Sequence, residues 1–243
     1  MATANSQGNG GLRVPWQDID TVFLDMDGTL LDLRFDNEFW REHIPRCYAR
    51  KHGLDIQMAK ADLFPRYQRV EGTIQWYCID YWSRELALDI AALKGELEEL
   101  IALHPYVLDF LDALRNVRKR VVLVTNAHSK SLALKLSRTG LGACVDRVVC
   151  AHDLGIPKEN LDFWPCLQER EVFRPQRTLL IDDSLPVLRA ARAYGIGYLL
   201  SVCQPDSQGP PRAADEFPMV RSFAELLAAP MVGAEKLDAI PDG

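Results

Sequence analysis

Two aspartates, Asp25 and Asp27, stand one residue apart at the end of the apolar segment Thr21–Leu24, and Gly28 follows them. Side chains two residues apart on a strand begin on the same side, so both carboxylates can reach one site. Carboxylates this close repel each other unless a cation lies between them. Asp25, ionised at pH 7, has the chemistry of a nucleophile toward phosphorus, and Asp27 that of the acid and base. The competing interpretation is an ordinary Asp-Gly turn.

Three further polar positions each follow another apolar segment. Thr125 and Asn126 stand before a helical pattern, where a hydroxyl and backbone N–H groups suit either phosphate oxygens or a helix cap. Lys158 would pair with both a phosphate and the first aspartate, although most lysines are simply solvated. Asp182 and Asp183 end the fourth segment and would complete a Mg²⁺ shell or cap the next helix.

The elements that must position these residues are short apolar segments alternating with amphipathic stretches. Continuous hydrophobicity is typical of strands buried on both faces, so we predict an α/β fold with a doubly wound parallel sheet. Right-handed crossovers bring the C-terminal ends of the strands to one edge, where a shared site explains the order of polar residues. The predicted strands are Thr21–Leu24, Val121–Val124, Arg147–Cys150, Thr178–Ile181 and Gly197–Val202. The predicted helices of this core are Tyr106–Val117, Ser129–Arg138, Asp162–Glu171 and Pro186–Tyr194.

Residues 33–104 interrupt this alternation with helical patterns alone, so we predict an all-helical cap inserted just after the aspartate loop. The core is then discontinuous, at 12–32 and 105–229, with flexible tails at 1–11 and 230–243. The predicted cap helices are Asp36–Lys51, Ile56–Val70, Thr73–Leu88 and Asp89–Leu103, with N-caps at Asp36, Asp55, Thr73 and Asp89 and a stop at Gly53. Pro45 and Pro65 should kink or shorten their helices.

Composition excludes several classes of function. The 243 residues carry 28 basic and 34 acidic side chains, a net charge of -6 that argues against a nucleic-acid partner. The six cysteines show no C-x-x-C spacing, which indicates reduced thiols in a cytoplasmic protein. A membrane span needs roughly 18 consecutive apolar residues, which the chain lacks, and its first residues do not resemble a signal peptide. The oligomeric state stays open.

The chain resembles the haloacid dehalogenase superfamily of hydrolases. Asp-Met-Asp-Gly-Thr at 25–29, Thr125, Lys158 and the pair at 182–183 match its motifs in order and spacing, over roughly residues 16–229. The resemblance implies a Rossmann-like core, dependence on Mg²⁺, a covalent aspartyl-phosphate and a mobile helical cap of the type placed after the first motif. One departure is Pro165, which leaves open where the helix after Lys158 begins.

The same resemblance implies a role for each matching residue. Asp25 would be nucleophile and metal ligand, and Asp27 acid–base with its backbone carbonyl on the metal. Asp183 would bind the metal directly, and Asp182 directly or through water. The phosphate would be held by Gly28, Thr125, Asn126 and Lys158.

The reaction and substrate follow from Asp27 and the cap. An alkoxide leaving group needs a proton near neutral pH, so an acid at Asp27 favours hydrolysis of a small-molecule phosphate ester. In Phe35–Trp40 and Gln75–Ser83 the chain resembles bacterial purine 5′-nucleotidases that prefer GMP and IMP. Trp40, Trp76 and Arg69 are therefore candidates for binding a purine, although such aromatic side chains also pack helices together. The alternatives are a sugar-phosphate phosphatase or phosphomutase on the same fold, and a non-catalytic phospholigand-binding protein.

Overall fold

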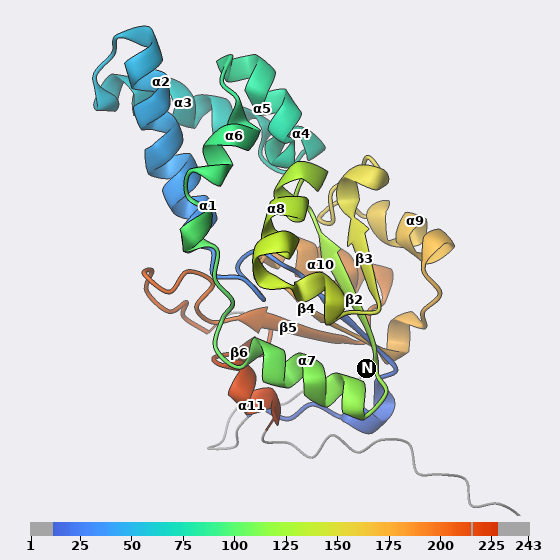
Figure 1. Cartoon of the computed structure of the whole chain (residues 1–243). Helices are drawn as coiled ribbons and strands as arrows, with labels where there is room; N and C mark the ends of the chain where they lie inside the picture. Colours follow the sequence, from blue (N-terminus) through green and yellow to red (C-terminus); the bar gives the residue numbers. More distant parts are fainter. Residues whose placement is uncertain (1–11, 215, 228–243) are drawn as a thin grey trace, which may run out of the picture.

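Six parallel strands form one sheet in the order β3-β2-β1-β4-β5-β6 (Figure 1). The computed structural model describes residues 12–214 and 216–227, so the predicted tails at 1–11 and 230–243 lie outside the described residues. The strands are β1 Thr21–Leu24, β2 Arg120–Thr125, β3 Arg147–Cys150, β4 Thr178–Ile181, β5 Tyr198–Val202 and β6 Met219–Val220. The predicted fold class is confirmed, and the sheet has one edge strand, β6, that the sequence pattern did not indicate.

Helices cover both faces of the sheet because both faces are apolar. Val22 and Leu24 of β1 join one hydrophobic cluster with Phe110, whereas Phe23 between them joins a second cluster with Trp164. Successive strand residues thus face opposite layers, which explains the continuous apolar pattern. The helices of these layers are α7 Val107–Asn116, α8 Ser129–Thr139, α9 Phe163–Arg170, α10 Leu185–Tyr194 and α11 Phe223–Leu227. Single 3₁₀ turns lie at Trp16–Asp18, Leu141–Ala143, Ala151–Asp153 and Pro175–Arg177.

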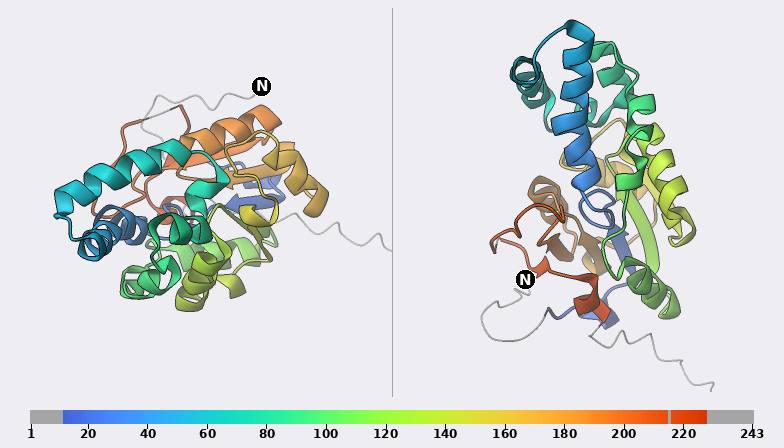
Figure 2. Two further views of the ribbon diagram at one scale, coloured as in Figure 1. Left: turned by 90° about the horizontal axis from the view of Figure 1, so that it is seen from above. Right: turned by 60° about the vertical axis from the view of Figure 1, so that its left-hand side comes forward.

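The helical insertion, residues 33–104, lies at one end of the molecule, apart from the sheet (Figure 2). It has its own hydrophobic cluster, which includes Phe39, Leu63, Trp82 and Ile90. Its helices are α1 Arg34–Glu38, α2 Ile44–His52, α3 Ile56–Val70, α4 Ile74–Tyr77, α5 Ile79–Leu86 and α6 Ile90–Gly95, with a π-helical turn at Phe39–His43 and a 3₁₀ turn at Glu98–Leu100. Its division from the core stays a prediction of domain boundaries.

The two connections between the insertion and the core run side by side. Leu31 and Leu103 form an isolated antiparallel bridge, and the N–H of Asp32 donates to the carbonyl of Ala102 at 2.9 Å. The N–H of His104 donates to the carbonyl of Leu30, also at 2.9 Å. The chain therefore leaves and re-enters the core at one place. Among the described residues, no helix is both long and apolar enough to cross a bilayer.

Two of the four predicted insertion helices are wrong in extent. The pattern over 73–88 is divided at Cys78, whose extended backbone (φ -84, ψ 108) ends α4 and whose sulfur accepts a hydrogen bond from the N–H of Tyr81 to cap α5. The pattern over 89–103 ends as a helix at Gly95, because a 3₁₀ turn and the bridge at Leu103 follow. Both segments keep apolar residues at helical spacing, so periodicity alone could not show the breaks.

The predicted caps are partly confirmed. Asp55 and Asp89 accept backbone hydrogen bonds at the starts of α3 and α6. Thr73 holds an N-cap position, but its hydroxyl donates to the carbonyl of Val70 instead. The prediction for Asp36 is wrong, because this residue lies inside α1 and its carboxylate contacts two lysines.

Glycine and proline behave as their backbone chemistry requires, with one exception. Gly53 ends α2 in the left-handed region (φ 65), as predicted. Pro45 directly follows the π-helical turn Phe39–His43 that joins α1 to α2, whereas Pro165 lies in the first turn of α9, where the missing N–H costs little. Pro65, expected to kink or shorten its helix, lies inside α3, which continues through it to Val70.

Candidate active site

The strand register brings the polar residues to one edge of the sheet. Leu24, the last residue of β1, pairs with Leu123 of β2 on one side and Ile181 of β4 on the other. The residues directly after β1 and β4, Asp25 and Asp182, therefore begin side by side. The N–H of Asp25 donates to the carbonyl of Ile181 at 3.0 Å and fixes this register beyond the end of the strand.

Lys158 lies at the centre of this edge and joins its neighbours. Its Nζ donates to Oδ1 of Asp25 at 2.5 Å, to Oδ2 of Asp182 at 2.7 Å and to the carbonyl of Val124 at 3.0 Å. The side chain is only 2% exposed. Burial opposes its charge, but the carboxylates of Asp182 and Asp25 outweigh that cost and raise the pKa of Lys158. The lysine is thus a fixed cation that orients the carboxylate of Asp25.

Three carboxylates meet beside this lysine. Oxygens of Asp25, Asp182 and Asp183 all lie within 4.8 Å of one another. Burial raises the pKa of Asp25 to about 6, and burial together with the charges of Asp25 and Asp182 raises the pKa of Asp183 well above its usual value. A cluster of hard, negatively charged oxygens is the ligand set that Mg²⁺ prefers, and a bound cation would lower these pKa values. The residues present fit the metal that the sequence predicted.

Gly28 allows the first loop to approach this cluster. Its φ of 82 lies in the left-handed region, and a Cβ built on it would lie 2.7 Å from Oδ2 of Asp183. Next to it, the hydroxyl of Thr29 accepts a hydrogen bond from the N–H of Asp183 at 3.1 Å. The loops after β1 and β4 are therefore held together at a distance that excludes a side chain at Gly28.

Asp27 faces a different cation, Lys135 of α8. Oδ1 of Asp27 accepts a hydrogen bond from Nζ of Lys135 at 2.6 Å. The same nitrogen donates to Asp36 of the insertion at 2.6 Å, and Asp36 also accepts from Lys94 of α6 at 2.7 Å. Burial raises the pKa of Asp27 to about 6, although Lys135 opposes the shift. A carboxyl with a pKa near the working pH can both donate and accept a proton.

The sequence analysis did not find Lys135, Lys94 or the role of Asp36. Lys135 follows Ser131 and Leu132, two other buried residues of α8, at helical spacing. A lysine on the buried stripe of a helix is the only signal that the sequence offered.

Asn126 supports the loop that carries Lys158, the lysine loop. Its Oδ1 accepts the hydrogen bond of the Lys158 N–H at 2.9 Å, and its Nδ2 donates to Oε2 of Glu159 at 2.8 Å. Thr125 uses its hydroxyl to accept a hydrogen bond from the N–H of Ala127 at 3.0 Å. Both side chains lie next to the carboxylate cluster, and their contact with a phosphate stays a prediction. Glu159 was missed by the sequence analysis.

A cavity of about 700 Å³ connects this edge with the insertion. The volume lies within the range typical of small-molecule sites. Every predicted catalytic and metal-binding residue lines it, together with Thr125, Asn126 and Lys158. From the insertion it receives Trp40 and Trp76, both predicted, and Arg41. Arg69 instead lines a second depression on the insertion, with Asp62 and Arg66, so the structure does not bring it to the other candidates.

Comparison with known proteins identifies the family of this chain. The model of the haloacid dehalogenase-like hydrolase family matches residues 19–195. The chain belongs to this family. As a haloacid dehalogenase-like hydrolase it is 41% identical, over 220 residues, to the GMP/IMP nucleotidase YrfG of Escherichia coli (strain K12), with 90% of this chain and 99% of that protein covered. The Shigella flexneri protein of the same name matches equally. The predicted family and enzyme class are confirmed.

Solved structures of this hydrolase family share the fold. A HAD phosphatase from Thermococcus onnurineus superposes with a TM-score of 0.72 at 21% identity, over 88% of this chain and 100% of that one. The L-2-haloacid dehalogenase of Xanthobacter autotrophicus superposes with a TM-score of 0.56 at 16% identity, over 86% of this chain and 96% of that one. Identities this low establish the architecture only, and the site residues must decide the reaction.

Proposed function

We propose that this hydrolase is a Mg²⁺-dependent phosphatase that cleaves purine nucleoside 5′-monophosphates such as GMP and IMP. One observation carries the reaction class: Asp25 and Asp27 line the same cavity, one held by Lys158 and the other by Lys135. Two carboxylates with different cationic partners suit two different tasks, attack and proton transfer. The identity to the nucleotidase YrfG supports the substrate class.

In the proposed reaction, Asp25 is the nucleophile and Asp27 transfers the protons. A carboxylate oxygen of Asp25 attacks phosphorus and forms an aspartyl-phosphate, while the carboxyl of Asp27 gives its proton to the departing alkoxide. Asp27, now a carboxylate, takes a proton from the water that attacks the same phosphorus and releases phosphate and Asp25. Lys158 holds Asp25 in position, as its 2.5 Å contact indicates. Lys135 holds Asp27 through its 2.6 Å contact.

Asp25, Asp182 and Asp183 would hold the Mg²⁺ ion, together with the backbone carbonyl of Asp27. When bound, the ion neutralises part of the charge of the phosphate and of the carboxylates around it. Thr125 and Gly28 would face the phosphate oxygens. A phospholigand-binding protein would need neither a nucleophile nor a buried acid beside it, so the non-catalytic alternative has less support.

The insertion would act as a cap that supplies substrate contacts. Trp40 and Trp76 of the insertion line the cavity. Trp40 also packs edge-on against Tyr67, at a distance of 5.8 Å between the ring centroids. Base stacking on such aromatic faces contributes about 1–3 kcal/mol in single-stranded nucleic acids. The insertion adds two cationic side chains to the cavity lining, Arg41 and Lys94, and because Lys94 is paired with Asp36, Arg41 would meet the polar edge of a purine.

A panel of phosphate esters tests the proposal. We expect kcat/KM to be highest for GMP and IMP, lower for AMP, CMP and sugar phosphates, and to depend on Mg²⁺. Equal values for sugar phosphates would reject the purine proposal and favour a sugar-phosphate phosphatase. An isomerised sugar phosphate without free phosphate would identify a phosphomutase.

Matched variants test the covalent step and the substrate surface. Asp25→Asn should abolish turnover, and an unchanged rate would refute the aspartyl-phosphate. Arg41→Ala should raise KM for GMP with little change in kcat. Arg69→Ala is its control, because this arginine lies in the second depression. If Arg69→Ala raises KM instead, the purine lies outside the proposed surface.

A further inference from the structure

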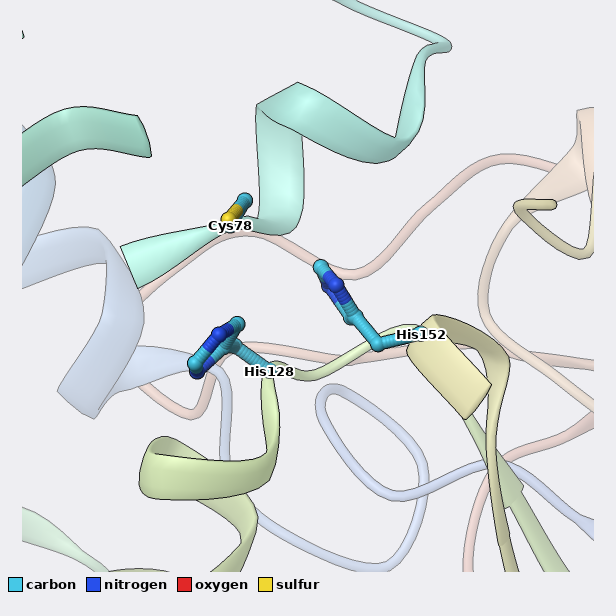
Figure 3. Close-up of side chains that lie close together, drawn as sticks. All are labelled: Cys78, His128 and His152. Atoms are coloured by element: carbon cyan, nitrogen blue, oxygen red, sulfur yellow. The ribbon is translucent and has the colours of Figure 1, made fainter. Parts of the chain in front are cut away.

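A second group of metal-binding side chains lies outside the carboxylate cluster. Cys78, His128 and His152 each place a ligand atom within 4.8 Å of the other two. They come from the α4–α5 turn, the loop before α8 and the 3₁₀ turn after β3, and Figure 3 shows the three side chains gathered in one space between these segments. The first belongs to the insertion and the other two to the core.

The donors in this group differ chemically from those of the carboxylate cluster. Two imidazole nitrogens and one thiolate sulfur are typical ligands of Zn²⁺, with bonds of about 2.0–2.3 Å, whereas Mg²⁺ prefers oxygen. Ligand atoms around tetrahedral zinc lie roughly 3.4–3.6 Å apart, as these bond lengths require. The present separations, all within 4.8 Å, would therefore need to close by about 1.4 Å at most.

The histidines are in a state suited to a metal. Burial lowers the pKa of His128 and of His152, which favours the neutral ring that a metal ligand needs. Among the described residues, Nε2 of His152 is buried and has no hydrogen-bond partner. A buried ring nitrogen without a partner is uncommon in proteins and calls for a ligand or a water.

His128 and Cys78 make only long contacts with their neighbours. A metal would replace the contact at Nδ1 of His128 and keep the one at Nε2. Nδ1 of His128 accepts a long hydrogen bond of 3.3 Å from the Lys130 N–H, and its Nε2 lies 3.7 Å from Oδ2 of Asp80. A metal that takes the Nδ1 lone pair leaves Nε2–H directed at this carboxylate, the arrangement that orients many metal-bound histidines. The sulfur of Cys78 stands at the N-terminus of α5, where the N–H of Tyr81 lies 3.3 Å away.

We propose that Cys78, His128 and His152 form a site for one Zn²⁺-like ion that ties the insertion to the core. The ion would link the α4–α5 turn to the loop that carries Thr125 and Asn126. Binding would therefore hold the insertion over the cavity, and it requires loss of the Cys78 thiol proton to solvent. The proposal concerns a separate site and does not depend on the substrate of the enzyme.

Cobalt binding to the full-length protein tests the site, with excess Mg²⁺ present to occupy the carboxylates. We expect one Co²⁺ per chain, a thiolate-to-cobalt charge-transfer absorption, and its loss when Zn²⁺ is added. Cys78→Ser should abolish the absorption, whereas the control Cys166→Ser, a half-buried cysteine of α9, should retain it. Asp80→Asn should weaken Co²⁺ binding by roughly 10- to 100-fold, the usual effect of removing an outer partner, and His152→Gln by more.

Two results would overturn the proposal. The absorption could persist in Cys78→Ser, or it could disappear in Asp183→Asn, which would place cobalt at the carboxylate cluster. Hydrogen exchange tests the link between the two parts. Zn²⁺ should slow amide exchange in α4 and α5 of the natural protein but not of Cys78→Ser, and equal rates in both proteins would refute the link.

Discussion

Replacing Lys135 with methionine probes the cation that holds Asp27. The lysine side chain is 2% exposed and contacts both Asp27 and Asp36 at 2.6 Å. Asp36 keeps a second partner in the variant, Lys94 at 2.7 Å, so the substitution leaves Asp27 as the carboxylate that loses its cation. Removing one partner of a buried pair costs about 3–5 kcal/mol. We expect a loss near the lower value, about 3 kcal/mol, because Asp27 can take up a proton.

The pH dependence distinguishes this explanation from a simple packing loss. The pKa of Asp27 in the folded protein, about 6, already exceeds its ordinary value of 3.8, and it rises further when Lys135 no longer opposes the shift. A raised folded pKa gives stability that is fully present below the ordinary value and is lost as pH rises through the folded pKa. The stability deficit of the variant should therefore grow as the pH rises above about 6.

Urea unfolding at several pH values measures the deficit, and steady-state kinetics measures the effect on the acid–base group. Turnover should fall by about 10²-fold, the effect of a small displacement of a reacting group. Lys130→Met is the matched control on the same helix, since Lys130 is more than half exposed and surface ion pairs contribute little. A deficit independent of pH, with normal turnover, would refute the role assigned to Lys135.

Three further predictions concern the carboxylates and the glycine at this edge of the sheet. Asp27→Asn should slow GMP hydrolysis by about 10² to 10⁴, but much less for an ester whose leaving group needs no proton, and equal losses would contradict the acid role. Gly28→Ala should raise the Mg²⁺ concentration needed for half-maximal kcat/KM, because its Cβ would lie 2.7 Å from Oδ2 of Asp183; an unchanged requirement would count against that carboxylate as a ligand. Chelation with EDTA should abolish turnover, and Mg²⁺ should restore it, whereas activity that survives chelation would exclude the metal site.

The strand ends of this fold are predictable from sequence for a physical reason. A strand buried on both faces must be apolar throughout, as Val22, Phe23 and Leu24 are, and the first polar residue then marks the edge of the sheet. Asp25 and Asp182 could be placed together on this basis alone. The edge strand β6, Met219–Val220, has only two residues and gives no periodic signal.

The contacts of Lys135 with Asp27 and Asp36 could not be predicted in the same way. Lys135 is buried because Asp27 and Asp36, 108 and 99 residues away in sequence, meet at its amino group. No local pattern records such a partnership, which exists only once the insertion has docked on α8. The same reason explains why Asp36 was assigned to a helix cap, since a cap is the local use of an aspartate near a helix start.

The insertion meets the core through apolar side chains such as Phe35 and Ile101, and also through hydrogen bonds such as that of Tyr77. Tyr77 of α4 donates to Oε1 of Glu159 at 2.9 Å, and the other oxygen of Glu159 binds Asn126, which supports the backbone of Lys158. Water can replace these hydrogen bonds when the two parts separate, whereas the apolar contacts favour the arrangement in which the two parts touch. These hydrogen bonds therefore connect α4 of the insertion with the loop that carries Lys158.

Tyr77→Phe tests this connection, because it removes the hydroxyl and keeps the ring. If closure aligns Lys158 through Glu159, the variant should lower kcat for GMP while its stability toward urea changes by only about 1 kcal/mol, the usual contribution of one hydrogen bond. Glu159→Gln keeps a hydrogen-bonding carbonyl and should retain more of the turnover than Tyr77→Phe. A variant that raises KM alone would instead mean that Tyr77 contacts the substrate, since a residue that acts through the lysine loop must change the chemical step.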